Sequence, residues 1–138
     1  MNPYLVMKKK HQDEHNDFPL FFAFSDQRFL VGLQKLGLSK DDVDQVVSIG
    51  AGGYCRKDDV ERLRNMGIRH KAEMTEALKD EAFLEDALTY ELANYEYGYT
   101  HDATDALETL GFTEEQVNSD PKLKRILRKA KRNQGDPF

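Results

Sequence analysis

The spacing of apolar and polar residues along the chain predicts a mainly helical protein. Helical patterns cover residues 4–16 and 25–36, and the second begins at a serine, a favoured N-cap residue. From Asp58 onward, apolar residues recur every three or four positions and predict a long helix with one buried stripe, which includes His70. Residues 83–97 are apolar on several sides, which is typical of a helix at the centre of a fold.

Shorter elements fill the gaps between these helices. The apolar run 20–24 is too brief for a helix and predicts a buried strand or a core-filling loop. Residues 46–49 and 54–57 flank a glycine-rich turn, which predicts a β-hairpin. Further short helices are predicted at residues 40–45, 103–110, 114–118 and 121–132.

One eleven-residue pattern occurs twice. It covers Leu33–Val43 and, 74 residues later, Leu107–Val117. In each copy the pattern predicts the end of a helix, followed by a glycine, an apolar residue and the N-cap of the next helix. A local corner motif explains the match more simply than duplication of a functional unit, although duplication stays open.

Length and composition are those of one small domain. The 138 residues predict a single α+β domain over 1–138, predominantly α-helical, with a small antiparallel hairpin packed on long central helices. The single Cys55 excludes an internal disulfide and suits a reducing compartment. No apolar run approaches the roughly 20 residues of a membrane span, and the N-terminal charges follow the apolar residues, the reverse of a signal peptide. We therefore expect a cytoplasmic protein without a membrane partner.

The charges are divided unevenly along the chain. Residues 1–120 carry a net charge of −11, and residues 121–138 carry +6. Four apolar residues from Leu123 to Ala130 occupy one helix face, so this basic segment either docks on the acidic body or binds an anionic partner. The candidate phosphate-binding residues are Lys124, Arg125, Arg128, Lys129, Lys131 and Arg132.

Polar residues on the two long helices form a second candidate site. A buried carboxylate on the central helix must be ion-paired, hydrogen-bonded or protonated. A hydrogen-bond network that fixes the packing is favoured over a ligand site. The expected members of this cluster are His70, Glu73, Tyr90, Glu91 and Asn94, with Arg56 nearby.

Two smaller candidates concern binding. Arg56 and Lys57 follow the glycine turn and could contact a phosphate, although the glycines match no nucleotide-binding motif and a turn explains them. Tyr97 and Tyr99 lie near a helix end and are candidates for a protein interface, where aromatic residues concentrate.

A third pattern raises the question of a metal. His11 and His15 with Glu14 fit H-x-x-E-H, which in zinc hydrolases supplies two ligands on one helix face. Such a site requires a third protein ligand, and Glu73 or Glu91 are among those available. Incidental surface residues are the favoured interpretation, and we expect no metal or other cofactor.

Several segments resemble a family of small uncharacterised bacterial and phage proteins, a domain of unknown function. The resemblance covers most of residues 11–127 and implies one compact domain, frequent residence on mobile elements and no established reaction. The segments that carry it are Phe18–Ser25, Gly50–Lys57, Arg69-His70 with Glu73, Tyr90–Tyr97 and Leu110–Thr113.

These observations favour a non-enzymatic protein that binds another macromolecule. The leading hypothesis is a phage-encoded, anti-CRISPR-like inhibitor that binds a host nuclease or defence complex through protein–protein contacts. The alternative is an accessory protein that binds nucleic acid through the C-terminal helix, and a zinc-dependent hydrolase is the third hypothesis. The oligomeric state is left open.

Overall fold

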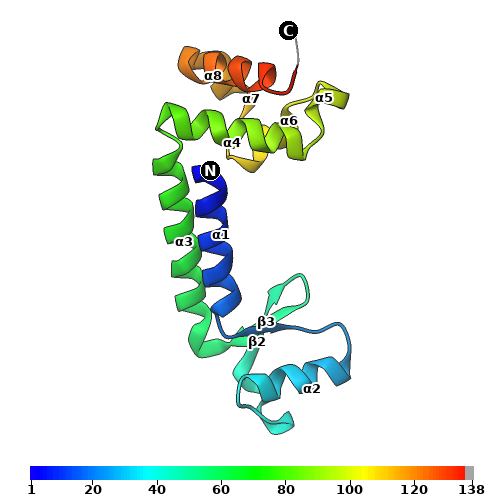
Figure 1. The fold of residues 1–138 in the computed structure, drawn as a ribbon. Helices are drawn as coiled ribbons and strands as arrows, with labels where there is room; N and C mark the ends of the chain where they lie inside the picture. Colours follow the sequence, from blue (N-terminus) through cyan, green and yellow to red (C-terminus); the bar gives the residue numbers. More distant parts are fainter. Residues whose placement is uncertain (136–138) are drawn as a thin grey trace. The chain divides into compact units, whose positions relative to one another are not determined.

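The computed structural model describes residues 1–135, which form two compact units (Figure 1). Unit 1 comprises Met1–Lys10 together with the chain from Ala72 onward, and unit 2 comprises His11–Lys71. The last three residues of the predicted basic tail lie outside the described residues. The single domain predicted over 1–138 stays a prediction, whereas the α+β class, mainly helical with a small antiparallel sheet, is confirmed.

Two long helices contribute residues to both units. Helix α1 (Pro3–Asp17) confirms the helix predicted at the N-terminus, and α3 (Val60–Ala77) confirms the long helix after Asp58. The prediction that α3 has a buried stripe overestimates its burial. None of its residues is fully buried, and His70 is half-buried.

Unit 2 is built on a three-stranded antiparallel sheet. Strands β2 (Val46–Gly50) and β3 (Gly53–Arg56) form the predicted hairpin, and β1 (Leu20–Phe22) pairs with the other side of β3. The run 20–24 is therefore a strand at its start, but it is not wholly buried. Phe22 in β1 and Phe24 after it are 54% and 77% exposed, because side chains alternate between the two sides of an extended chain and Phe21 and Ala23 take the side that faces the core.

A short helix covers the core of unit 2. Helix α2 (Asp26–Lys35) begins where the Ser25 hydroxyl accepts the N–H of Arg28, as the cap pattern predicts. The 3₁₀ helices η1 (Lys40–Gln45) and η2 (Lys57–Asp59) flank the hairpin. Leu20 and Cys55 are buried in the sheet, and the main buried cluster of this unit consists of Phe21, Ala23, Leu33, Leu36 and Val46.

Unit 1 is organised around the predicted central helix. Helix α4 (Glu81–Asn94) is capped by Asp80, and its buried face includes Leu88 and Glu91. The helix predicted to run to Tyr97 ends earlier, because Glu96 adopts a left-handed conformation with φ of 58° and starts the separate turn α5 (Tyr97–Thr100).

Three further helices surround α4. These are α6 (Thr104–Thr109), α7 (Glu114–Ser119) and α8 (Pro121–Arg132), each within two residues of its predicted bounds. The apolar face of α8 is buried against α4, and Figure 1 shows the two helices side by side. Of the alternatives that the sequence left open, α8 therefore docks on the acidic body. Every helix of the part of the chain described here is too short or too polar to cross a membrane.

Candidate functional site

The basic side chains of α8 are divided between two rows. The inner row faces α4: Arg125 forms an ion pair with Glu81, and Lys129 Nζ lies 3.1 Å from Oε1 of Glu85. A hydrogen bond from Asn133, followed by the interaction with Lys129, lowers the pKa of Glu85 and keeps its carboxylate ionised. The two cations of the inner row are therefore ion-paired with carboxylates of unit 1.

The outer row consists of Lys124, Arg128 and Arg132. These residues are spaced four apart, so they follow one another along a single helix face. All three are exposed, and within residues 1–135 none of them has an ion-pair partner. The half-buried Lys131 is turned elsewhere, with its Nζ 5.6 Å from the centre of the Tyr97 ring. Of the six predicted phosphate-binding residues, three thus remain available to an external anion.

The two candidate interface tyrosines have opposite environments. Tyr97 is 4% exposed and belongs to the core of unit 1, so its assignment to an interaction surface is wrong. Its burial follows from the break after α4, which turns the chain back so that this ring packs inward. Tyr99 is 94% exposed and remains available to a partner.

Glu91 is the centre of a closed polar cluster in unit 1. Its side chain is fully buried; the Tyr4 hydroxyl donates to Oε2 at 2.8 Å and Asn94 Nδ2 donates to Oε1 at 3.3 Å. Lys8 Nζ lies 3.7 Å from Oε2 and also above the rings of Tyr4 and Tyr90. Burial and the hydrogen bond to Glu91 raise the pKa of Tyr4, which keeps the phenol protonated as the donor.

This cluster has the properties of a structural network. Both carboxylate oxygens have partners on the protein, and the buried group leaves no face for a ligand. Sequence analysis identified Glu91, Asn94 and Tyr90 but missed Tyr4 and Lys8. Their spacing of four on α1 was the available indication, since it places both on one helix face.

His70 belongs to a different set of contacts, in unit 2. Its ring stacks on that of His11 with centroids 4.0 Å apart, and its Nε2 lies 3.5 Å from Oε2 of Glu14. Arg69 forms a bidentate pair with the same carboxylate, and this hydrogen bonding lowers the pKa of Glu14 to about 2. The contacts join the C-terminal half of α1 to the middle of α3 and involve neither Glu91 nor Asn94.

The glycine turn does not present two free cations. Arg56 donates to the backbone carbonyl of Leu36 and lies 3.3 Å from Oδ2 of Asp59, so its guanidinium is occupied within unit 2. Lys57 is exposed, on the η2 turn. The predicted phosphate site at this turn therefore lacks its arginine.

One observation bears on the hypothesis of a metal site. Among residues 1–135, no three His, Cys, Asp or Glu side chains are grouped so that they could hold a metal ion. His11 stacks on His70, and His15 lines a pocket beside α2.

That pocket was missed by sequence analysis. It lies in unit 2 between β1 and α2 and has a volume of about 410 Å³. The spacing of Arg28, Val31, Gly32 and Lys35 was the available indication, because i, i+3, i+4 and i+7 define one face of a helix.

Comparison with known protein families gives one match. Residues 3–133 match the model of a family of unknown function (DUF7659), so the chain belongs to that family. No curated protein and no solved structure matches the chain.

Proposed function

We propose that this member of the family of unknown function is a non-enzymatic protein that binds nucleic acid through the outer face of α8. The observation that carries the proposal is the division of the basic side chains into two rows. Arg125 and Lys129 are paired with acidic residues of α4, whereas Lys124, Arg128 and Arg132 are exposed and unpaired within the described residues.

Docking of the helix makes this row a fixed surface. The apolar residues of α8 are buried against unit 1, so the outer cations are held on a rigid helix and their spacing is set before binding. Successive members are four residues apart, about 6 Å along the helix axis. A row of this kind can follow a phosphate backbone without reading bases, since no base-specific motif accompanies it.

The strength expected from such a surface is modest. Three phosphate contacts give a slope of log Kobs against log salt of about −2 to −3, at about −0.7 to −0.9 per contact. Binding without base contacts has Kd values of about 10⁻⁴ to 10⁻⁶ M. Residues 1–120 carry a net charge of −11, which disfavours contact of a polyanion with most of that part of the chain, whereas residues 121–138 carry +6.

Fluorescence anisotropy with a labelled 20-nucleotide single strand tests this proposal. The test variant replaces the outer row, Lys124→Gln, Arg128→Gln and Arg132→Gln. The matched control replaces Arg125 and Lys129 of the inner row together with Lys122, whose Nζ donates to the backbone carbonyl of Lys79. The control is therefore Lys122→Gln, Arg125→Gln and Lys129→Gln, and both variants lose the same net charge. We expect the outer-row variant to lose binding and most of the salt dependence, whereas the control keeps both.

Two results would contradict the proposal. Equal losses in the two variants would mean that only the total charge matters. Absence of binding by the unaltered protein at 50 mM salt would remove nucleic acid as the ligand of this face.

A second candidate function is supported by Tyr99, whose side chain is 94% exposed. The residues on either side of α5, Glu96 and His101, both have left-handed backbone conformations, with φ of 58° and 56°. Such conformations are uncommon outside glycine, so the turn that presents Tyr99 has a defined shape. An aromatic side chain exposed on such a turn is a typical anchor of a protein interface. The specific form of this function is inhibition of a host defence complex by a phage-borne protein in the cytoplasm.

Affinity capture from nuclease-treated host lysate tests the second function. A stoichiometric partner should be lost with Tyr99→Ala and retained with Tyr99→Phe, which keeps the ring. A nuclease or defence complex as that partner would support the specific form. Equal capture by the alanine variant would show that Tyr99 is not the anchor.

A further inference from the structure

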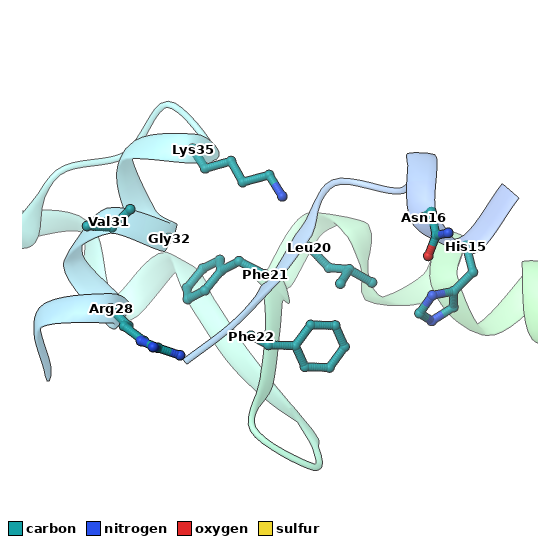
Figure 2. A pocket seen from close by; sticks show the side chains of 9 residues that line it. All are labelled: His15, Asn16, Leu20, Phe21, Phe22, Arg28, Val31, Gly32 and Lys35. Carbon is teal, nitrogen blue, oxygen red and sulfur yellow. The ribbon is translucent and has the colours of Figure 1, made fainter. Parts of the chain in front are cut away.

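The pocket beside α2 combines apolar walls with unpaired positive charge (Figure 2). It lies wholly within unit 2, and its volume of about 410 Å³ falls in the range of small-molecule sites, roughly 300–1,000 Å³. Its floor is formed by β1, an edge strand that pairs with β3 on one side only.

One face of α2 supplies the opposite wall. Arg28, Val31, Gly32 and Lys35 share this face, whereas Leu33 and its neighbours on the adjacent face enter the core. The pocket face is therefore apolar in the middle and basic at both ends. Val31 is 62% exposed and so remains accessible to a ligand.

Glycine is required at the centre of this face. A Cβ atom on Gly32 would lie 2.0 Å from Cδ2 of the Phe21 ring, far inside van der Waals contact. The absence of a side chain lets this ring lie directly against the backbone of α2. The neighbouring Phe22 presents a second ring, 54% exposed, to the pocket. Phe21 is 4% exposed and belongs to the core of unit 2, so Phe22 is the aromatic ring of this strand that a planar apolar group can contact.

The charges that line the pocket are of one sign. Arg28 and Lys35 have no ion-pair partner among residues 1–135, and no acidic side chain belongs to the lining. His15, near the end of α1, adds an imidazole ring to the lining. Figure 2 shows the Arg28 and Lys35 side chains extending from α2 toward the strand that carries the two phenylalanine rings. Unpaired cations beside an apolar cavity favour a ligand that is both anionic and apolar.

We propose that this pocket binds a small aromatic anion. The planar body of the ligand packs against Phe22 and Val31, and its sulfonate, phosphate or carboxylate group accepts hydrogen bonds from Arg28 and Lys35. The site is separate from the outer row of α8 and does not depend on the function proposed for that helix.

Paired probes with and without a charge test both halves of this proposal. The first probe is 8-anilinonaphthalene-1-sulfonate, and the second is N-phenyl-1-naphthylamine, which has the same ring system without the sulfonate. Fluorescence titration of the full chain should give one saturable site for the anionic probe. Its binding should shift the amide resonance of Gly32 in a ¹H–¹⁵N spectrum.

Variants then separate charge from apolar contact. The pair Arg28→Gln and Lys35→Gln should weaken binding of the sulfonate probe at least about tenfold, because two charge-assisted hydrogen bonds are removed. Binding of the neutral probe should change by less than about twofold. The matched pair Lys40→Gln and Arg64→Gln removes the same charge outside the pocket and should leave both probes unaffected. Val31→Glu, at an exposed position that the fold tolerates, should abolish binding of the sulfonate probe.

Three results would overturn the proposal. These are equal weakening by the two charge-removing pairs, equal weakening of the charged and neutral probes, and a Gly32 amide that does not move at saturation. Circular dichroism of each variant establishes that the loss of binding is not a loss of fold.

Discussion

The two units of this protein distribute their apolar residues differently. Among the described residues, fifteen buried side chains pack into one cluster in unit 1, whereas the buried cluster of unit 2 has five, with Leu20 and Cys55 buried beside it. Unit 2 also leaves Phe22, Phe24 and Val31 more than half exposed. The difference indicates a division of roles: unit 1 has the core to support a charged outer helix, and unit 2 keeps apolar side chains around a pocket.

The largest expected effects come from removing one fully buried leucine in each unit. Leu88 in unit 1 and Leu33 in unit 2 are both 0% exposed. Replacement of either by alanine should cost about 2–5 kcal/mol of the free energy of unfolding, with Leu88→Ala toward the upper end because its surroundings are more extensively packed. Urea denaturation measures the two values.

Hydrogen exchange shows whether each leucine replacement destabilises only the unit that contains it. We expect Leu33→Ala to accelerate exchange in α2 and the sheet, and Leu88→Ala to accelerate it in α4 and α8. Acceleration throughout residues 1–135 by either variant would contradict independent units and would support the single domain predicted from the sequence.

The next effect concerns the buried polar network of unit 1. Tyr4→Phe removes the hydroxyl that donates to the buried carboxylate of Glu91 and should cost about 1.5–3 kcal/mol, the range for hydrogen bonds to charged groups. Tyr95→Phe is the matched control, because its hydroxyl contacts Thr109 Oγ1 at 2.8 Å on the surface. The control should cost about 0.5 kcal/mol. Equal destabilisation of the two variants by thermal unfolding would show that Glu91 does not depend on Tyr4.

A smaller effect distinguishes two glycines of unit 2. Gly32→Ala in α2 should cost about 1–2 kcal/mol, because overlap with the Phe21 ring outweighs the better helix propensity of alanine. Gly67→Ala in α3 meets nothing within 4 Å and should stabilise by about 0.5–1 kcal/mol. Urea denaturation measures the change in the free energy of unfolding for each variant, and changes of opposite sign would confirm the close packing at the pocket. Stabilisation by Gly32→Ala would contradict it.

The features that sequence analysis predicted well are local ones. The repeated pattern forms the same corner in both units: Gly37 and Gly111 have φ of 76° and 82°. The N–H of the residue after each glycine donates to the carbonyl five residues earlier, at 2.8 Å from Leu38 and 2.9 Å from Phe112. These are local helix endings, so adjacent residues determine them wherever they occur.

The features that sequence analysis missed depend on residues distant in the sequence. Glu91 was identified as a buried carboxylate, but its donor Tyr4 is 87 positions away. The pairing of β1 with β3 brings Phe21 opposite Tyr54, and no pattern in either segment specifies that partner. The pocket depends on this pairing, so a helix face with basic ends could be seen in the sequence but its cavity could not.

The smallest effect is a pH dependence confined to unit 2. The hydrogen-bonded Arg69 lowers the pKa of Glu14 from 4.5 to about 2. A carboxyl group with a lowered pKa in the folded state stabilises that state above about pH 4.5, and this contribution is lost as the pH falls toward 2. In a ¹³C titration of the side-chain carboxyl groups, Arg69→Gln should move the midpoint of Glu14 toward 4.5. The control is Arg62→Gln, which removes another cation of α3, one that lies over the Phe18 ring, and it should leave the Glu14 midpoint in place. An equal shift in both variants would mean that the total charge, rather than the bidentate pair with Arg69, sets the Glu14 pKa.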